Sequence, residues 1–423
     1  MNVLILGSGG REHCFAELIS ESKNCDKLFV APGNSGTSLI AENLDISPLD
    51  FDLVKGVIIK YNIQLVVVGP EDPLVKGIHD FIISDPIMKD VKVIGPKQRA
   101  AQLEGSKNFA KDFLNRHNIP TAKHKTFTSV QFEEACEYIE NNDPPYVLKA
   151  DGLAAGKGVL IIDNANQAKD ELYQMLVNSK FGAASSSVVI EEFLDGIELS
   201  CFVLTDGKNY KILPSAKDYK RIGEGDTGLN TGGMGAISPP PFLTSIIKEK
   251  IENRIIYPTI KGFEADNLDY IGFLFFGLIL VEGDPYVIEY NVRMGDPETQ
   301  VVLPRINSDF LELLNSTHTR CLSEFDLQIN ENSAATVVMV SGGYPETYEK
   351  NKLIKGLDKV KNSKVYHAGV LKEKGLLKTN GGRVLAVTSL GEDVNRALET
   401  SYRSITKIAF KNQYYRKDIG FDL

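Results

Sequence analysis

Four short apolar runs near the start of the chain each end in a loop that contains glycine. The runs occupy residues 2–6, 27–30, 65–68 and 91–94, and they alternate with segments of helical spacing such as 11–19. Buried runs of this length, bounded by glycine and alternating with helices, predict a parallel α/β sheet. Ligands of such sheets bind beyond the carboxyl ends of the strands. We therefore expect a parallel α/β domain over residues 1–104, with its ligand site at the glycine loops.

The middle of the chain has a different pattern. With 423 residues, and about 150 residues per domain, two to four domains are expected. Strands at 146–150 and 159–163 enclose a glycine-rich loop, which predicts a hairpin flap within a small subdomain at about 121–190. This subdomain belongs to a central domain, 105–325, in which the glycine-rich stretch 223–235 is expected to be a flexible loop.

The last region predicts a small mixed α/β domain over residues 326–423. Short strands are expected at 336–340, 365–370 and 383–388. A hairpin-type turn is expected at 380–382 and a closing helix at 392–408.

The composition excludes several classes of protein. A net charge of −9 argues against a nucleic-acid-binding protein, which usually carries a basic excess. The five cysteines are widely spaced and form no C-x-x-C pair, which fits a reducing cytoplasm and excludes a cysteine-rich zinc module. The first residues form a strand rather than a basic leader, and no apolar run approaches the ~20 residues of a membrane helix. We expect a cytoplasmic protein without a nucleic-acid or membrane partner.

Two glycine loops resemble nucleotide fingerprints but do not match them. A G-x-G-x-x-G motif that starts at Gly7 would need glycine where Glu12 stands, although the loop can still hold a phosphate or form a tight turn. In the loop 151–158, Gly152 and Gly156 are too close together for a Walker A motif. We expect a mobile flap that covers phosphates, with Lys149 and Lys157 beside it; the alternative is a pair of solvated lysines.

Polar residues alternate along the strand that begins at Tyr286. Alternation places Val287, Glu289, Asn291 and Arg293 on one face. Carboxylate and amide oxygens suit Mg²⁺, which often takes one or two protein ligands beside substrate phosphates. Arg293 could hold an anion in a bidentate manner. The alternative is a salt-bridged strand end in which Arg293 pairs with Glu289.

Two further segments allow a functional or a structural interpretation. The run 188–194 ends in carboxylates, Phe193 and Leu194, and it could form an adenine pocket with Glu198 on the ribose, or simply a strand that leads to a charged turn. Asp218 and Lys220 precede the glycine-rich stretch, so they could belong to an active-site lid or to a solvated face.

The order of these elements resembles the ATP-grasp superfamily and, within it, the phosphoribosylamine–glycine ligase (glycinamide ribonucleotide synthetase) family of purine biosynthesis. The resemblance covers nearly the whole chain, and its motifs are Gly7–His13, Gly69–Leu74, Leu103–Lys107, Lys149–Gly158, Ile190–Gly196, Asp226–Gly235, Gly295–Gln300, Ser341–Pro345 and Thr379–Arg383. It implies a pre-ATP-grasp N-terminal domain, an ATP-grasp domain with its flap, and a small C-terminal domain. It also implies that ATP phosphorylates glycine to glycyl phosphate, which 5-phosphoribosylamine attacks to give glycinamide ribonucleotide, ADP and phosphate.

The resemblance further implies a role for each candidate residue. ATP phosphates would be held by Lys107, Lys149, Gly156 and Lys157, adenine by Glu191, Phe193 and Leu194, and the ribose by Glu198. Glu289 and Asn291 would bind Mg²⁺ or Mn²⁺. Arg293 and Asp218 would orient glycine and its acyl phosphate. The substrates would also meet Gly9, Gly10, Asn34, Lys220, Gly295 and Asp296.

Departures and rivals complete the analysis. Tyr219 stands where histidine is common in the family, and Met294 replaces a commoner phenylalanine. The rivals are another ATP-grasp ligase or carboxylase, a nicotinamide-dependent dehydrogenase, and a non-catalytic nucleotide sensor. The motifs at Gly7 and Gly69 weigh against another ATP-grasp enzyme, and the broken fingerprint weighs against a dehydrogenase. The intact Glu289, Asn291 and Arg293 weigh against a non-catalytic sensor. We expect a monomer, with a weak homodimer as the alternative.

Overall fold

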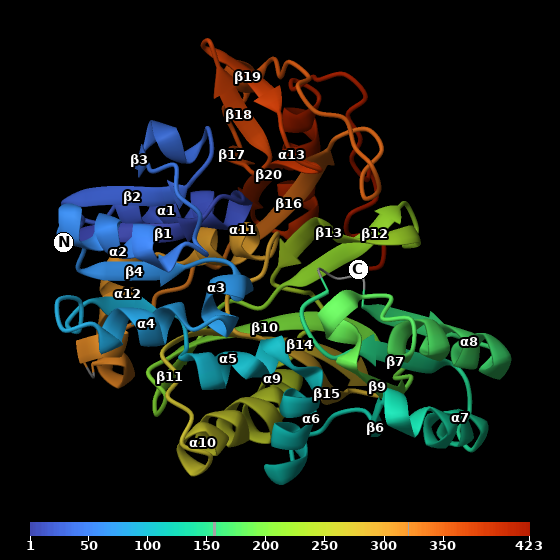
Figure 1. Cartoon of the computed structure of the whole chain (residues 1–423). Helices are drawn as coiled ribbons and strands as arrows, with labels where there is room; N and C mark the ends of the chain where they lie inside the picture. Colours follow the sequence, from blue (N-terminus) through green and yellow to red (C-terminus); the bar gives the residue numbers. More distant parts are fainter. Residues whose placement is uncertain (155–157, 320) are drawn as a thin grey trace.

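The computed structural model describes residues 1–154, 158–319 and 321–423. The N-terminal region is a parallel five-stranded sheet of order β3-β2-β1-β4-β5 (Figure 1). Its strands are β1 (Asn2–Gly7), β2 (Lys27–Pro32), β3 (Glu42–Asn43), β4 (Leu65–Val68) and β5 (Lys92–Ile94), and its helices are α1 (Gly10–Ser20), α2 (Phe51–Lys60), α3 (Glu71–Val75) and α4 (Ile78–Ser84). The parallel α/β fold predicted from the apolar runs is confirmed.

Strand β1 shows why the apolar runs are continuous. Val3 and Ile5 belong to one hydrophobic core cluster, whereas Leu4 and Leu6 belong to another. Both faces of the sheet are therefore buried, and a strand in such a sheet carries apolar residues at every position. The loops after β1, β2 and β4 consequently meet at one edge of the sheet.

The central region contains an antiparallel sheet of order β11-β10-β14-β15. It comprises β10 (Ile197–Thr205), β11 (Tyr210–Ile212), β14 (Gly272–Val281) and β15 (Asp284–Asn291), with helices α5 (Gln98–Gly105), α6 (Lys107–Arg116), α9 (Ser245–Ile251) and α10 (Tyr257–Ala265). A π-helical turn, 252–256, joins α9 to α10. Figure 1 shows α5, α6, α9 and α10 below this sheet and the N-terminal region beside it.

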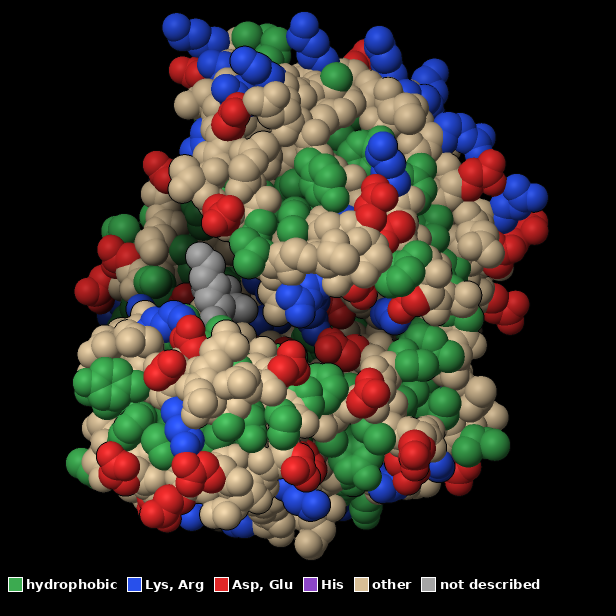
Figure 2. Space-filling model, turned by 90° about the vertical axis from the view of Figure 1, so that its right-hand side faces the viewer, with side chains coloured by type: hydrophobic (Ala, Val, Ile, Leu, Met, Phe, Trp, Pro, Cys, Tyr) green, Lys and Arg blue, Asp and Glu red, His purple; other side chains and the backbone are tan. Residues whose placement is uncertain are grey.

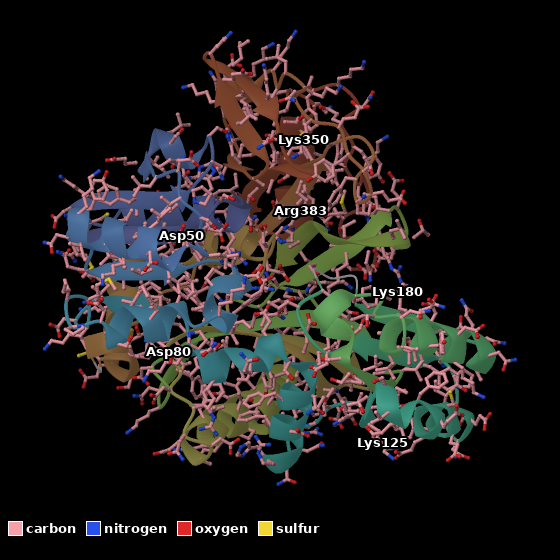
Figure 3. All side chains as sticks on the ribbon, in the orientation of Figure 1. Asp50, Asp80, Lys125, Lys180, Lys350 and Arg383 are labelled. Atoms are coloured by element: carbon pink, nitrogen blue, oxygen red, sulfur yellow. The ribbon has the colours of Figure 1, made fainter. Side chains whose placement is uncertain are left out.

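The flap subdomain has a hydrophobic core of its own. Its antiparallel sheet has the order β6-β9-β7-β8. The strands are β6 (His124–Thr128), β7 (Tyr146–Ala150), β8 (Val159–Ile162) and β9 (Ser187–Glu192), packed with α7 (Phe132–Glu140) and α8 (Ala165–Leu176). The hairpin predicted for β7 and β8 is confirmed by their pairing from Lys149–Val159 to Tyr146–Ile162. Figure 3 places Lys125 and Lys180 on this subdomain, away from the C-terminal region.

The C-terminal region corrects two expectations. The stretch 223–235 is mostly strand: β12 (Lys217–Gly223) and β13 (Thr227–Ser238) form a hairpin, so the prediction of a flexible loop was wrong. Glycine here allows close packing, since a Cβ on Gly235 would lie 2.8 Å from the Ile419 side chain. The turn predicted at 380–382 does not form a hairpin, because the strands on its two sides belong to different sheets.

The C-terminal sheet therefore contains two strands from the middle of the chain. Its order is β12-β13-β16-β20-β17. Besides this hairpin it comprises β16 (Ser333–Val340), β17 (Lys364–His367) and β20 (Arg383–Gly391), next to the two-stranded sheet β18 (Val370–Glu373) and β19 (Leu376–Thr379) and helix α13 (Val394–Ile405). Helices α11 (Thr299–Val302) and α12 (Phe310–Thr319) connect β15 to this region. Among the described residues, no helix has the length and apolar character needed to cross a membrane.

The separate core of the flap subdomain predicts local destabilisation. Leu148 is fully buried in that core, so Leu148→Ala should lower the free energy of unfolding by about 2–5 kcal/mol. Amide hydrogen exchange should accelerate in β6 to β9 before it does in β1 or β4. Ile161→Ala, at a half-exposed position of the same sheet, is the matched control and should change stability by less than about 0.5 kcal/mol. Equal losses for both variants would contradict this account.

Candidate active site

A cavity of about 510 Å³ lies where the four regions meet. Its lining includes Arg11 of α1, Lys107 of α6, Lys149 of β7, Glu289 of β15 and Arg383 of β20. Figure 2 shows the molecule hollowed between its upper and lower parts, with acidic and basic side chains gathered along the hollow. Arg383 extends from the C-terminal sheet toward the centre (Figure 3). The sequence thus brings charged groups from distant segments into one site.

A bulge in β15 determines which of its side chains face the cavity. Glu289 lies opposite Gly277 of β14, but Val287 lies opposite the next residue, Leu278, so β15 carries one additional residue. Val287 is consequently buried in the hydrophobic core, and the prediction that it shares a face with Glu289 was wrong. Glu289 and Asn291 do line the cavity together, with Asn291 Nδ2 3.3 Å from Glu289 Oε1.

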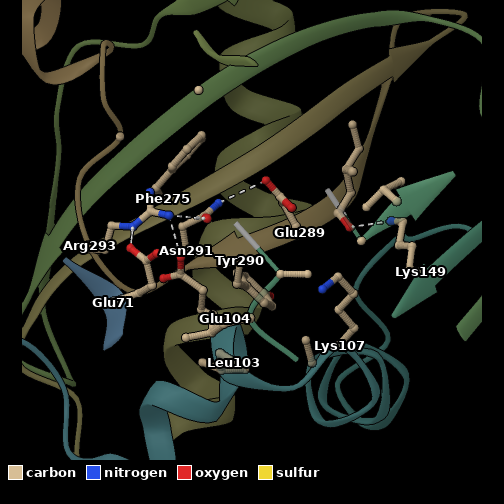
Figure 4. Close-up of a pocket in the computed structure, with 18 of the residues that line it drawn as sticks. Glu71, Leu103, Glu104, Lys107, Lys149, Phe275, Glu289, Tyr290, Asn291 and Arg293 are labelled. Atoms are coloured by element: carbon tan, nitrogen blue, oxygen red, sulfur yellow. Dashed lines mark hydrogen bonds and ion pairs between the residues drawn. The ribbon is translucent and has the colours of Figure 1, made fainter. Parts of the chain in front are cut away.

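Arg293 is held by two carboxylates from other segments (Figure 4). Its Nε donates to Glu71 at 3.1 Å, and its Nη2 donates to Glu104 at 2.5 Å and to Asn291 Oδ1 at 3.1 Å. The alternative in which Arg293 pairs with Glu289 is therefore wrong. Burial raises the pKa of Glu104 to about 7, even though Arg293 favours its charged form. Burial works against the charge of Arg293 as well, but the two carboxylates raise its pKa.

The opposite end of the cavity carries three lysines, two of which pair with the Glu191 carboxylate. Glu191 Oε2 lies 2.9 Å from Lys149 Nζ and 3.1 Å from Lys111 Nζ. Burial favours protonation of Glu191, but the two lysines hold its pKa below the usual range. Burial also lowers the pKa of Lys111, to about 8, and that of Lys107, whose Nζ donates to Gly152 O at 3.0 Å. In Figure 4, Glu289 lies between Arg293 and the lysines Lys107 and Lys149.

Several acidic side chains surround Lys220. Its Nζ lies 2.6 Å from Glu198 Oε2 and 3.8 Å from Asp218 Oδ1. Burial raises the pKa of Asp218. Burial, together with the nearby charge of Asp218, also raises the pKa of Glu298 to about 7. Burial disfavours the charge of Lys220, but the carboxylates of Asp218 and Glu198 raise its pKa well above the usual value.

Asp296 connects the cavity to the first glycine loop. It accepts from Gln300 Nε2 at 2.7 Å and pairs with Arg383 Nη2 at 3.2 Å. A Cβ on Gly9 would lie 3.0 Å from Asp296 Oδ2, and one on Gly10 would lie 2.5 Å from Gln300 Nε2. Glycine at both positions therefore lets α1 begin directly against these polar side chains. Glycine is needed at position 295 for a similar reason, because an added Cβ would lie 2.4 Å from the Glu298 carboxylate.

Several predicted site residues are not brought to the cavity. In the part of the chain that the structure describes, the predicted residues that do not line it are Gly9, Gly10, Asn34, Phe193, Leu194 and Glu198. Asn34 Nδ2 donates to the carbonyls of Ser8 at 2.9 Å and His367 at 2.7 Å, which orders the loop after β2. Gly156 and Lys157 lie outside the described residues.

Sequence reasoning missed several residues that line the cavity, and signals for them existed. Lys111 follows Lys107 by four residues, which is one helical turn and hence the same face. Four more lie within motifs that carried the resemblance and are charged residues to which no role was assigned: Glu71, Glu104, Glu298 and Arg383.

A family model for an ATP-grasp (A) domain matches residues 105–299, the part of the chain that supplies most of the cavity wall, so the chain contains an ATP-grasp domain. A solved biotin carboxylase domain of the Hydrogenobacter thermophilus 2-oxoglutarate carboxylase, in complex with MgADP, has a TM-score of 0.72 over 97% of this chain and 90% of that one. The two sequences are 16% identical, so this similarity establishes the fold alone.

Closer similarities establish the family. Family models described as the phosphoribosylglycinamide synthetase N domain, ATP-grasp (A) domain and C domain match residues 1–104, 105–299 and 334–422. Phosphoribosylamine–glycine ligases of Haemophilus influenzae and Fusobacterium nucleatum are 47% and 45% identical, over 100% and 99% of this chain and 98% of each relative. The crystal structure of phosphoribosylamine–glycine ligase from Thermotoga maritima is 34% identical, with a TM-score of 0.86 over 99% of this chain and 100% of that one. The chain belongs to the phosphoribosylglycinamide synthetase family, and the resemblance inferred from its motifs is confirmed.

The raised pKa of Glu298 predicts a pH-dependent stability difference. Its folded-state pKa of about 7 lies above the usual 4.5, so the folded protein binds more protons than the unfolded chain between these values and loses stability as pH rises through them. Glu298→Gln should therefore gain stability relative to the parent protein between pH 5 and pH 8, by on the order of 1–3 kcal/mol. Denaturant unfolding at several pH values measures this difference.

Glu331→Gln, which removes an exposed carboxylate, is the control for loss of charge alone. A Glu298→Gln difference that stayed constant from pH 5 to pH 8, or that reversed in sign, would contradict the burial argument.

Proposed function

We propose that this protein ligates glycine to 5-phosphoribosylamine with ATP, forming glycinamide ribonucleotide, ADP and phosphate in purine biosynthesis. One observation supports the proposal above the others. A single cavity holds lysines at one end, a carboxylate–amide pair in the middle, and mixed charges around Arg293 and Asp218 at the other end. Membership of the phosphoribosylglycinamide synthetase family supplies the substrates.

The chemistry explains why such a cavity is needed. A carboxylate is a poor electrophile toward an amine, and phosphorylation by ATP turns one of its oxygens into a leaving group. The ATP γ-phosphoryl group moves to the glycine carboxylate, and the amine of phosphoribosylamine then forms the C–N bond as phosphate leaves. Phosphoryl transfer depends chiefly on positioning and on neutralisation of charge. Acyl phosphates hydrolyse readily, so a site enclosed by a flap favours the productive reaction.

The lysine end suits the nucleotide. We assign Lys107 and Lys149 to the ATP phosphates, together with the loop that contains Gly156 and Lys157. Glu191 holds Lys149 in place by their contact at 2.9 Å, in addition to its proposed place beside adenine. The adenine roles of Phe193 and Leu194, and the ribose role of Glu198, remain proposals that depend on β9 ending beside the cavity.

The middle of the cavity suits a divalent cation. Glu289 and Asn291 place a carboxylate and an amide side by side on one wall, where Asn291 Nδ2 donates to Glu289 Oε1 at 3.3 Å. Mg²⁺ needs few protein oxygens when phosphates complete its shell. Such a cation would neutralise charge on the transferring phosphoryl group. Mg²⁺ is our proposal, with Mn²⁺ as a possible substitute.

The far end suits the acceptor substrates. Asp218 and Glu298 offer carboxylates to the glycine ammonium group, while Arg293 and Lys220 offer positive charge to its carboxylate and acyl phosphate. The backbone at Gly9, Gly10 and Gly295, together with Asp296, is proposed to meet phosphoribosylamine. Asn34 would act there by ordering its loop, because its amide is bonded to backbone carbonyls.

We propose a monomer in the cytoplasm, with a weak homodimer as the alternative. We also propose domains at residues 1–104, 105–325 and 326–423, with the flap subdomain at about 121–190.

The function predicts a strict co-substrate requirement. ADP should form only when glycine, Mg²⁺, ATP and freshly made phosphoribosylamine are present together, and glycinamide ribonucleotide should accumulate in equal amount. A coupled ADP assay with omission of each component measures this. ADP formation that does not depend on glycine, or that is faster with another amino acid, would contradict the assignment of glycine as the substrate.

Arg293→Ala should separate chemistry from nucleotide binding. We expect turnover to fall by a factor of at least about 10² because an acyl-phosphate contact is lost, while ATP affinity changes little. Because the change leaves Glu104 buried without its partner, Arg293→Ala/Glu104→Gln serves as a second variant that removes the orphaned charge. Arg403→Ala, at an exposed arginine of α13, is the control. An equal collapse of ATP binding would show that Arg293 serves the nucleotide instead.

A further inference from the structure

Strand β12 carries two cavity residues and is irregularly paired over its second half. It lies at the edge of the C-terminal sheet, with β13 on one side. Its regular pairing with β13 ends at Tyr219, which lies opposite Gly235, and the next pair, Arg221 with Asn230, is out of register. The backbone carbonyl of Lys220 accepts from the Thr231 hydroxyl at 2.7 Å. The regular ladder therefore supports Asp218, which lies opposite Ala236, but it ends before Lys220.

The two faces of β12 have different partners. Asp218 and Lys220 line the cavity, and they alternate with Lys217 and Tyr219, which point the other way. Tyr219 is buried, and its hydroxyl donates to Asp422 Oδ1 at 2.9 Å. Lys217 Nζ forms an ion pair with the same carboxylate. Asp422 thus holds the two side chains that flank Asp218.

The segment 414–422 continues this contact along the hairpin. The side chain of Arg416 is fully buried, and its Nη1 donates to Asp226 at 2.5 Å and to Arg221 O at 3.2 Å. The Asp418 carboxylate accepts two hydrogen bonds of 2.8 Å from the Arg416 guanidinium and one of 2.7 Å from Gly225 N. The Arg416 guanidinium lies 5.5 Å from the centre of the Tyr219 ring. Both ends of β12 are therefore fixed by one segment from a distant part of the sequence.

We propose that Asp422 and Arg416 are positioning residues, which hold β12 so that Asp218 and Lys220 project into the cavity at the place of the glycine substrate. Neither residue touches the cavity within the described part of the chain. The inference rests on the proposed function in its assignment of Asp218 and Lys220 to glycine. It also gives Tyr219 a role: the tyrosine faces Asp422 rather than the reacting groups, so it anchors the strand and transfers no proton.

Asp422→Ala tests the proposal because it removes both contacts to β12 at once. A displacement of about 1 Å in a positioning group can reduce turnover by a factor of about 10², so we expect kcat/KM for glycine to fall by about tenfold or more, with ATP affinity in the absence of glycine changed by less than about twofold. Asp422→Asn keeps an acceptor for the Tyr219 hydroxyl, so its kcat/KM for glycine should lie between those of the parent protein and Asp422→Ala. Tyr219→Phe and Asp422→Ala should be non-additive when combined.

Hydrogen exchange supplies a readout that is independent of catalysis. The amides of residues 217–223 should exchange faster in Asp422→Ala. They should not do so in Lys378→Ala, which breaks an exposed ion pair with Glu373 on β18 and β19. If Asp422→Ala does not fold, Asp422→Asn and Tyr219→Phe carry the same comparison.

The outcomes separate this inference from the proposed function. Unchanged exchange in β12, unchanged glycine kinetics, or equal losses toward glycine and ATP that follow the melting temperature would each overturn the positioning role. A parent protein that consumes ATP without glycine would overturn the proposed function, and the exchange in β12 would still decide whether Asp422 fixes the strand.

Discussion

The ion pair between Arg293 and Glu104 is the interaction on which the cavity depends. One Glu104 oxygen accepts from Arg293 at 2.5 Å and the other accepts from the Val292 amide at 2.7 Å, so the end of β15 is tied to the end of α5. Glu71 adds the N-terminal region to the same guanidinium. Removal of one partner from a buried pair leaves the other charge uncompensated, which makes this junction costly to disturb. Glu104 fixes the wall on which Glu289 and Asn291 stand through its bond to the Val292 amide, and Arg293→Ala leaves that bond in place.

Local patterns predicted a large part of the fold because the forces behind them are local. The apolar runs in β1, β4 and β7 predict strands directly, since a strand that is buried on both faces carries apolar residues at nearly every position. Glu289, Asn291 and Arg293 were recognised as one polar group because alternation is a property of the backbone. The ordered motifs then indicated the family, which the comparisons confirm.

The remaining features depend on contacts between distant segments, which no local pattern contains. The bulge that moves Val287 into the core arises from the pairing of β15 with β14. The glycines of the stretch 223–235 predict a flexible loop, but pairing with β12 and packing of Gly235 against Ile419 make most of it a strand. Arg293 was given the wrong ion-pair alternative, because Glu104 lies 189 positions away in the sequence.

The central claim is that Glu289 and Asn291 bind the metal–nucleotide complex while Arg293 serves the group that ATP activates. Binding of Mn²⁺–ATP to the protein, followed by electron paramagnetic resonance without glycine, tests it most directly, because only the nucleotide half is then engaged. Glu289→Gln should weaken the complex by about tenfold or more, whereas Glu331→Gln should bind like the parent protein. Unchanged Mn²⁺–ATP binding by Glu289→Gln would contradict the account.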